Sequence, residues 1–555
     1  MSSGLRMRVR PPSVILASVE AATPADGDPT GRLARPSLAS AAAIVAAGFL
    51  LSRLLGVGRS IAIADAFGTS PELSAYWVAF RLPDLVFQLL AGATLGSAFI
   101  PTFARLFTKQ SEEAAWRLAR SVLNLIFIAT VVFAVLGFLL APLLVPAMAP
   151  GLGEDTGQQE ELRSLAVNLT RIMLISPVLF AVSGMFMGIL NARHHFLLPA
   201  LAPALYNLAI IVGALVSDDV HTLAWAVVIG ASLHLVVQVP ALAAVGMRYK
   251  FEASWRDADV REVARLMAPR VVGLAAFQFN LLITVFFAST VSDEAISGVN
   301  YAWLITLTPL ALFGMAISTA VFPTMAEQAA GNLAELRRTL EQSLRLILFL
   351  TLPAAAALMV LSEPLVAFFF ERGAFTEAST DIVQSALLYY AIGLVALAAI
   401  EILSRAFYAL SDTRTPVLFA VVALCVNLVL SAILVHPLEV RGLALSVSLA
   451  TIVEAALLFW ALRSRIEGLD LRALGMSVGR TLVAVMLMVE AIAVYLILLD
   501  QAGHLDANRA VGAFLALAGS SVIGTAVFVG AARALRSQEL DTVLRRVPFL
   551  DRFAA

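Results

Sequence analysis

The stretch SVLNLIFIATVVFAVLGFLLAPLLVP, residues 121–146, shows the pattern that decides the fold, because it carries no charged residue. A membrane helix needs about 20 largely apolar residues, so this stretch is long enough to cross a bilayer. The connector before it, 105–120, is rich in Lys and Arg, whereas the connector after it, 153–161, is acidic and has neither. The stretch therefore predicts a transmembrane helix whose basic end faces the cytoplasm.

The same alternation of charge continues along the chain. Basic connectors lie around 105–120, 248–270, 337–345 and 463–480, and acidic or polar connectors lie at 68–74, 153–161, 217–221 and 292–297. Candidate spans begin near residues 39, 76, 121, 164, 198, 222, 268, 298, 343, 382, 416, 440, 476 and 509. Fourteen spans is an even number, so we expect both termini on the cytoplasmic side. Arginines after the last span agree with this: Arg533, Arg536, Arg545 and Arg546.

Composition excludes several classes of protein. The mean hydropathy is +0.89, and only 14% of the residues are charged, against about a quarter in soluble domains. The single cysteine, Cys425, permits neither an internal disulfide nor a cysteine-based metal site. No phosphate-binding Walker A sequence is present, so ATP hydrolysis is not encoded. We expect an all-α polytopic membrane protein that is not an enzyme, with no cofactor, no metal and no nucleic-acid partner.

The two ends of the chain differ from the spans. Residues 1–38 are basic, Pro-containing and mixed in polarity, which predicts a disordered cytoplasmic N-terminal tail. The apolar stretch after them is too long for a signal peptide. Residues 536–552 alternate charged and apolar side chains, which predicts a short helix within a cytoplasmic interfacial tail, 536–555.

The two halves of the chain resemble each other at a nearly constant offset. Ala98-Phe-Ile-Pro-Thr-Phe-Ala104 matches Ala320-Val-Phe-Pro-Thr-Met-Ala326, and three weaker matches occur in the same order. We therefore expect two parallel six-helix repeats, 39–250 and 264–465, followed by two extra helices within 475–535. Parallel repeats are an architecture of transporters, with the substrate held between the halves.

Charged residues inside the first span are the main candidates for a site. Arg53 and Arg59 lie in the apolar run Leu51-Ser-Arg-Leu-Leu-Gly-Val-Gly-Arg-Ser60. Intramembrane charges are costly and usually face a cavity or a partner. Either both arginines reach an interface or pair with an acid such as Asp65, or they line an anion-binding cavity, since Arg suits phosphate. A bend at Gly56 and Gly58 would bring them together.

Arg81 and several other polar residues allow more than one interpretation. Arg81 either lies in the same cavity or pairs locally with Asp84. Asn207 and Asn427 occupy equivalent repeat positions, which favours helix–helix hydrogen bonds. Glu401, Glu454 and Glu490 are either paired or proton carriers. His194 and His195 have no companion metal ligands, and the pair Asp218–Asp219 is not the repeated carboxylate motif of a prenyl-diphosphate enzyme.

Several motifs resemble the MurJ (MviN) family of lipid II flippases, within the multidrug/oligosaccharidyl-lipid/polysaccharide exporter superfamily. They are Ser52-Arg-Leu-Leu-Gly-Val-Gly-Arg59, Ala79-Phe-Arg-Leu-Pro-Asp84, Arg372-Gly-Ala-Phe-Thr376 and Ser404-Arg-Ala-Phe-Tyr-Ala-Leu-Ser-Asp-Thr-Arg-Thr-Pro416. The resemblance runs from about residue 40 to 535. It implies a V-shaped transporter that moves a lipid-linked sugar diphosphate across the bacterial plasma membrane by alternating access. It also implies that Arg53 and Arg59 bind the substrate. Together with Arg81, Ser52 and Gly56 they form the expected substrate-binding group.

The resemblance is incomplete in two segments, at four positions. Phe87 and Gln88 stand where the family usually has arginines, and Trp303 and Leu304 replace a common Asp-Arg pair. The cavity is therefore expected to be less cationic than is usual in the family. Three explanations remain open: a different substrate, compensation by Arg81 and Arg270, or a diphosphate held mainly by the first helix.

The function that these features predict is a lipid II flippase, which moves the undecaprenyl-linked peptidoglycan precursor to the outer leaflet. Its partners would be that precursor, membrane lipids and, further, cell-wall synthesis proteins. The alternatives are an exporter of another lipid-linked oligosaccharide or drug of the same superfamily, and a transport-inactive scaffold. A membrane-embedded transferase is disfavoured because no carboxylates cluster at a membrane surface.

Overall fold

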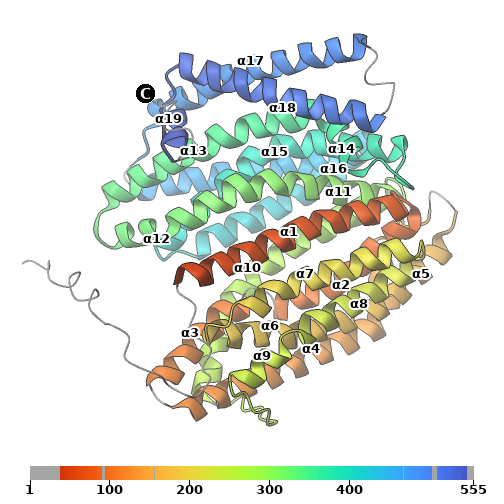
Figure 1. Cartoon of the computed structure of the whole chain (residues 1–555), viewed down its shortest axis with the longest axis vertical. Coiled ribbons are helices and arrows are strands. Elements are labelled where there is room, and N and C mark those ends of the chain that lie inside the picture. Colours follow the sequence, from red (N-terminus) through yellow and green to blue (C-terminus); the bar gives the residue numbers. More distant parts are fainter. Residues whose placement is uncertain are drawn as a thin grey trace, which may run out of the picture.

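The computed structural model describes residues 38–90, 94–109, 111–154, 157–466, 468–502 and 509–546, and over these residues the chain is helical with short connectors. The predicted tail up to residue 37 and the last residues from 547 lie outside this range. Within it, 11 helices are long and apolar enough to cross a membrane. The predicted all-helical polytopic fold is therefore confirmed at this level (Figure 1).

The helices of the first half pack mainly on one another. Among them α1 packs on α7, α7 on α8, α2 on α5, and α6 on α3, α4 and α8. Their bounds are α1 Leu38–Phe67, α2 Pro71–Leu90, α3 Thr94–Lys109, α4 Glu112–Met148, α5 Gln159–Met173, α6 Ile175–Ala192, α7 Leu197–Val216, α8 Val220–Val236 and α9 Val239–Ala244.

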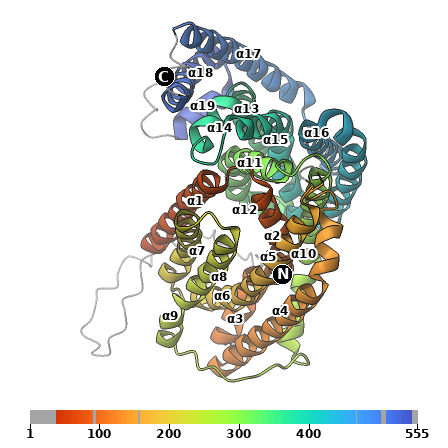
Figure 2. The ribbon, with the colours of Figure 1, turned by 90° about the vertical axis from the view of Figure 1, so that its right-hand side faces the viewer.

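A second group forms around α15, which packs on α11, α12, α13, α14 and α16. The group comprises α11 Ala295–Pro309, a π-helical stretch Leu310–Met315, α12 Ala316–Gly331, α13 Leu333–Val360, α14 Ser362–Phe370, α15 Glu377–Ala409 and α16 Arg414–Arg465. One helix, α10 (Ala258–Ser289), contacts α2, α3 and α4 of the first group and α16 of the second. Figure 2 shows the two groups one above the other.

The last three helices lie on the outer side of the second group. The pair α17 (Leu471–Gln501) and α18 (Arg509–Ala534) packs on α13 and α14, and the short α19 (Gln538–Arg546) contacts α13 and α18. Within the predicted 536–552 segment, the described residues therefore do form a short helix. In Figure 1 these helices are dark blue at the top of the molecule.

Several helices begin before the apolar runs that predicted them. The helix α4 begins at Glu112 rather than near 121, and α13 at Leu333 rather than near 343. Capping explains the earlier starts: the Ser111 hydroxyl accepts from the Ala114 N–H at 3.1 Å, and the Asn332 side chain accepts from the N–H groups of Ala334 and Glu335. These side chains satisfy backbone donors that the first turn leaves without partners. The extra turns are amphipathic, so an apolar pattern misses them.

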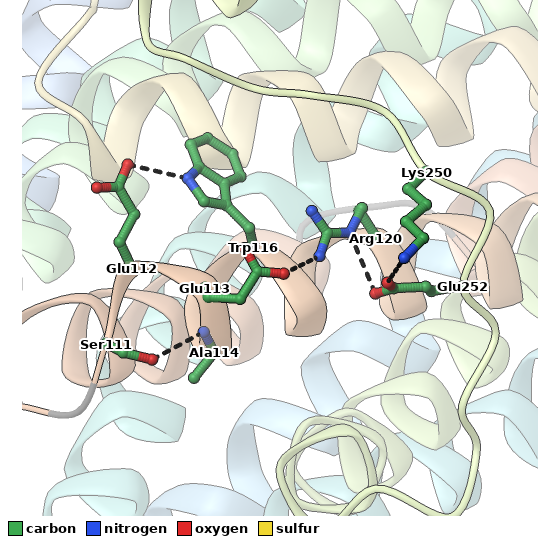
Figure 3. Close-up of polar contacts among 8 residues, drawn as sticks. All are labelled: Ser111, Glu112, Glu113, Ala114, Trp116, Arg120, Lys250 and Glu252. Carbon is green, nitrogen blue, oxygen red and sulfur yellow. Dashed lines mark hydrogen bonds and ion pairs between the residues drawn. The ribbon is translucent and has the colours of Figure 1, made fainter.

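The connector between α9 and α10 is fixed against α4 by a buried arginine (Figure 3). Arg120 donates through Nη2 to Glu113 at 2.6 Å and through Nε to Glu252 at 3.1 Å. Asn124 donates to the carbonyl of Glu252 at 2.8 Å, and the Tyr249 hydroxyl donates to Asn124 at 2.9 Å. The connector that leads from the first group into α10 is thus held on the first group.

Candidate functional site

A cavity of about 500 Å³ lies among the helices of the first group. Its walls come from α1, α2, α3, α6, α7 and α8. The lining residues are Arg59, Ile63, Tyr76, Trp77, Phe80, Asp84, Phe87, Gln88, Ile100, Phe180, Gly184, Met187, Gly188, Asn191, Pro203, Tyr206, Ile210 and His234. This size is typical of small-ligand sites.

Arg59 is the cation of this cavity, and it forms no ion pair with another described residue. No carboxylate among the described residues lies within ion-pair distance of it. Its Nε is buried and has no hydrogen-bond partner, and the same is true of Nε1 of Trp77, which lines the same cavity. A buried donor without an acceptor is costly. Two such donors in one cavity indicate a site for an acceptor that arrives with a ligand, and the positive charge favours an anion.

Another part of the cavity wall is built from aromatic rings. The ring of Phe87 lies 5.2 Å from that of Phe180, and Phe180 lies 5.1 Å from Tyr206 and 5.3 Å from His234, centroid to centroid. The last two contacts are edge-to-face, a favoured arrangement for aromatic pairs. Phe87 thus belongs to an aromatic cluster on the wall of the cavity.

His234 is held in position by a buried polar chain. The Ser183 hydroxyl contacts Nδ1 of His234 at 2.6 Å, and the Gln238 side-chain amide donates to that hydroxyl at 2.7 Å and to the His234 carbonyl at 2.9 Å. All three residues are at least nine-tenths buried. Because Nδ1 is occupied, Nε2 is the ring nitrogen left for a ligand in the cavity.

Asp84 gives the cavity one carboxylate, and it is hydrogen-bonded from the neighbouring α10. Gln278 donates to its Oδ2 at 3.0 Å, and Gln88 lies 3.5 Å from its Oδ1. The site therefore contains an anion and a cation that do not pair with each other. An arrangement of this kind can bind a diphosphate at Arg59 while Asp84 accepts from hydroxyl or amide groups of the same molecule.

The structure does not bring Arg53 into the cavity with Arg59. The helix α1 runs unbroken from Leu38 to Phe67, without the bend considered at Gly56 and Gly58. Arg53 is exposed on the helix surface, with its guanidinium carbon 5.1 Å from the Phe49 ring centroid. Six residues of helix, about 9 Å of rise, separate it from Arg59.

Ser52 and Gly56 serve helix packing in this structure. Asn207 of α7 donates to the carbonyl of Ser52 at 3.2 Å, and its side-chain nitrogen is the nearest group to Gly56. Asn427, at the equivalent position of the second half, donates to Asn280 of α10 at 2.8 Å. Both asparagines therefore make the helix–helix hydrogen bonds that the sequence predicts.

Arg81 does not line the cavity, and its buried Nε, like that of Arg59, has no hydrogen-bond partner. Its Nη2 donates to Oδ1 of Asn300 at 2.5 Å, and Asn300 in turn donates to the carbonyl of Ile296. Because Arg81 lies on α2 and Asn300 on α11, this contact joins the two helix groups rather than lining the cavity. Arg270, the other candidate for compensation, lies outside the described side chains.

Of the three candidate glutamates, one is paired, one is exposed, and Glu454 is half-buried without a described partner. Glu401 forms an ion pair with Arg405 at 2.5 Å, as its paired interpretation predicts, and Arg405 also donates to Thr319 at 3.1 Å. Glu490 is exposed. No group of three or more His, Cys, Asp or Glu residues suited to a metal is found among the described residues.

The two helix groups meet through close polar contacts at one end of the molecule. The Ala374 N–H donates to the carbonyl of Asp65 at 2.7 Å, and the hydroxyls of Ser74 and Ser297 are 2.9 Å apart. Two further contacts join Thr69 Oγ1 to Ser379 Oγ at 2.9 Å and the Gly153 N–H to Asp293 Oδ1 at 2.6 Å. This end carries the acidic and polar connectors, and we call it the sealed end.

Sequence reasoning found Arg59 but missed the aromatic part of the site. Phe180, Tyr206 and His234 come from three helices, and nothing in their local sequence shows that they meet.

Comparison with known proteins adds a family. The profile of the family described as "Lipid II flippase MurJ" matches residues 63–506. The lipid II flippase MurJ of Burkholderia cenocepacia is 34% identical over 435 residues, which cover 76% of this chain and 84% of the relative. The probable lipid II flippase MurJ of Thermotoga maritima is 29% identical over 499 residues, which cover 90% of this chain and 97% of the relative.

Solved structures show the same fold. A structure titled "Lipid II flippase MurJ, inward closed conformation" superposes with a TM-score of 0.73 at 24% identity and covers 88% of this chain and 98% of that one. An inward-facing MATE-family multidrug transporter of the MOP superfamily superposes with a TM-score of 0.63 at 18% identity, covering 77% of this chain and 98% of that one.

Proposed function

The chain belongs to the lipid II flippase MurJ family, and from this premise we propose how its cavity and its sealed end carry lipid II across the membrane. It is a transporter and not an enzyme, and it is a multi-pass protein of the bacterial inner membrane. Its substrate is a lipid-linked precursor. The proposal assigns the residues that bind this substrate and the direction in which the protein faces.

The observation that carries the proposal is that Arg59 and Trp77 line one cavity, and that Nε of Arg59 and Nε1 of Trp77 are buried without hydrogen-bond partners. In our proposal, the diphosphate of lipid II supplies the missing acceptors. Arg59 offers a planar fork suited to phosphate oxygens, and Trp77 adds one donor. Arg53, about 9 Å farther along α1 from the sealed end, would meet the diphosphate first. This arrangement favours the explanation in which the first helix holds most of the diphosphate.

The aromatic cluster of Phe87, Phe180 and Tyr206 would contact the sugar next to the diphosphate. A pyranose ring has an apolar face of C–H groups, which packs on aromatic faces, and its hydroxyls suit acceptors such as Asp84. A cavity of about 500 Å³ takes the diphosphate and one sugar, so the rest of the headgroup would extend beyond this cavity. The lipid tail would remain in the membrane.

We also propose fourteen spans in two parallel six-helix repeats. Eleven spans are found on length and composition. Glu439, with φ 51° and ψ −130°, divides the 52-residue α16 into two helices, which makes twelve. Adding α2, which has three charged residues, and the 32-residue α10 makes fourteen. The lobes would then be 39–250 and 264–465, with α17 and α18 as the two extra helices.

The sealed end would face outward in this topology, since it carries the acidic connectors. The protein would then be closed to the outside, with its cavity reached from the cytoplasmic side. Moving the substrate requires the sealed end to open while the other end closes, which is alternating access.

The test is lipid II translocation by the purified protein in proteoliposomes. Wild type should move lipid II, and Arg59→Ala should lose one to two decades in affinity, because a charged hydrogen bond contributes about 1.5–3 kcal/mol. Complementation of cells depleted of their own lipid II flippase is the second readout. Wild type that moves another lipid-linked saccharide but not lipid II would support the exporter alternative, and wild type that moves neither would support a scaffold.

Topology has a separate test in intact cells. After Cys425 is replaced by Ser, a cysteine at Thr376, exposed beside the sealed end, should react with an impermeant maleimide, whereas one at Arg117, exposed on α4, should not. The reverse labelling pattern would invert the proposed orientation.

A further inference from the structure

A second polar cavity, of about 490 Å³, lies between α12, α13 and α19. Its wall contains hydroxyl and amide groups from all three helices, with a few apolar side chains. The lining residues are Ile317, Ala320, Val321, Thr324, Thr339, Gln342, Ser343, Arg345, Leu346, Gln538, Glu539 and Thr542. None of them belongs to the cavity around Arg59, so this cavity is a different site. Figure 1 shows α19 beside the end of α13.

The cavity contains one cation and one anion that do not pair. Arg345 has a buried Nε without a hydrogen-bond partner and makes no ion pair among the described residues. Glu539 is only 8% exposed, and its two oxygens accept from the hydroxyls of Ser477 and Ser537 at 2.7 and 2.9 Å. These are neutral donors, so no described cation balances its charge. The nearby Arg480 donates instead to the carbonyl of Arg536.

Two opposite charges on the wall of one cavity fit a ligand that carries both signs. A purely anionic group would pair with Arg345 but would be repelled by the carboxylate of Glu539. A purely cationic group would pair with Glu539 but would be repelled by the guanidinium of Arg345. A buried charge without a counter-charge is costly, so a dipolar ligand relieves both at once. Phosphoethanolamine has this chemistry: a phosphate for Arg345 and the hydroxyls, and an ammonium with three donors for Glu539.

The position of the cavity suits a lipid rather than a soluble molecule. Thr324 lies seven residues before the end of α12 and Thr339 six residues after the start of α13, so the cavity is about 10 Å along either helix from the turn that joins them. In the proposed topology this turn is cytoplasmic, which places the cavity near the headgroup layer. Ile317, Val321 and Leu346 add an apolar wall that acyl chains can contact.

We propose that this cavity binds the headgroup of a phosphoethanolamine lipid of the cytoplasmic leaflet, with its phosphate on Arg345 and its ammonium on Glu539. The bound lipid bridges α13 to α19, and so ties the C-terminal helix to the second helix group. The proposal does not depend on which substrate the protein transports, so it stands or fails separately from the lipid II assignment.

The experiment is native mass spectrometry of the purified full chain, titrated with phosphatidylethanolamine, phosphatidylglycerol and phosphatidylcholine. Wild type should bind the ethanolamine lipid at least about tenfold more tightly than the other two, the factor that one charge-assisted hydrogen bond supplies. Arg345→Gln should lose this binding, whereas Arg338→Gln, at an exposed arginine on the same helix, should not. Glu539→Gln should weaken binding of the ethanolamine lipid and strengthen that of the glycerol lipid.

Several results would overturn the proposal. Equal binding of the three lipids by wild type would contradict a site specific for phosphoethanolamine. Equal effects of Arg345→Gln and Arg338→Gln on binding would contradict it as well. Soluble glycerophosphoethanolamine that binds as tightly as the lipid would assign the cavity to a soluble molecule. Arg345 makes no described hydrogen bond to α19, so the Arg345 variant decides the question if Glu539→Gln does not fold.

Discussion

At the scale of single residues, the two arginines of α1 differ in what surrounds them. Arg59 lines the cavity with a buried Nε that has no partner, whereas Arg53 is exposed and stacks over Phe49. A guanidinium on the wall of a cavity acts through the directions of its five donors. An exposed one acts mainly through its charge, which a lysine also supplies.

Lysine substitutions should therefore separate the two positions. Arg53→Lys is expected to keep lipid II translocation close to wild type, since it preserves the charge. Arg59→Lys is expected to recover only part of the activity that Arg59→Ala loses, because an ammonium lacks the planar fork. Initial rates in proteoliposomes measure both. Equal rescue at the two positions would mean that Arg59 also acts as a simple point charge.

Phe87 provides a second prediction, about the sugar. Phe87→Leu keeps an apolar side chain but removes the ring that packs on Phe180. Aromatic contacts of this kind contribute about 0.5–1.5 kcal/mol beyond area burial. We expect weaker binding of lipid II, by a few-fold to about tenfold, and unchanged binding of undecaprenyl diphosphate, which has no sugar. Isothermal titration with both lipids measures this, and an equal loss for both would place the ring against the diphosphate instead.

A site residue could be predicted when its signal lay within its own sequence segment, and could not when it depended on contacts between distant segments. Arg59 was found because a charge in an apolar run is unusual within its own segment. The contact of Arg81 with Asn300 joins residues far apart in sequence, and no local pattern specifies it. The aromatic cluster was missed for the same reason, since its rings come from α2, α6, α7 and α8.

At the scale of elements, the turn between α15 and α16 is organised by one carboxylate. Asp412 accepts from the N–H groups of Arg414 and Thr415 at 3.0 Å and from the Thr415 hydroxyl at 2.6 Å. It also pairs at 2.9 Å with Arg465, at the other end of α16. Burial raises the pKa of Asp412, but the hydrogen bonds from Thr415 and Arg414 and the charge of Arg465 outweigh it, so the pKa lies below its ordinary value.

This lowered pKa predicts a pH dependence of stability. A carboxylate with a depressed folded-state pKa contributes stability above its unfolded pKa of about 3.9, and loses it as pH falls through the folded value. Asp412→Ala should lower stability by about 0.5–2 kcal/mol near neutral pH, the usual cost of losing a cap. The difference from wild type should shrink on acidification. Thermal unfolding in detergent at several pH values measures this.

The control for this prediction is Asp381→Ala, because Asp381 is exposed on α15 and bonds only Gln384 among the described contacts. It should change the unfolding temperature little at any pH. A gap between Asp412→Ala and wild type that stays constant from neutral to acidic pH would show that the carboxylate charge is not what stabilises the turn.

Element boundaries show where sequence patterns stop being informative. Apolar runs placed the centres of the helices well, because burial in lipid demands an uninterrupted apolar segment. The amphipathic first turns of α4 and α13 lie outside that segment, where capping by Ser111 and Asn332 decides the start. The π-helical stretch Leu310–Met315 had no signal in the sequence pattern.

At the scale of the whole molecule, the sealed end depends on close backbone approach between the two helix groups. Gly68 and Gly373 both have positive φ, at 57° and 55°. A Cβ at Gly68 would overlap the carbonyl oxygen of Ala374, and one at Gly373 would overlap that of Asp65. The motif Arg372-Gly-Ala-Phe-Thr376 therefore has a structural reason, which is to let this loop contact the end of α1.

A cross-link at the sealed end should stop transport, because alternating access requires this end to separate. Ser74 and Ser297 come from different helix groups, and their Oγ atoms are 2.9 Å apart, so cysteines at both positions are within reach of disulfide geometry. In a Cys425→Ser background, the double variant should lose lipid II translocation under oxidation and regain it with a reductant. Each single cysteine variant should be indifferent to both treatments. Gel mobility after protease cleavage between the halves reports the extent of cross-linking. If the fully cross-linked protein still moved lipid II at the rate of the reduced protein, separation of the two groups at this end would not be part of the transport cycle.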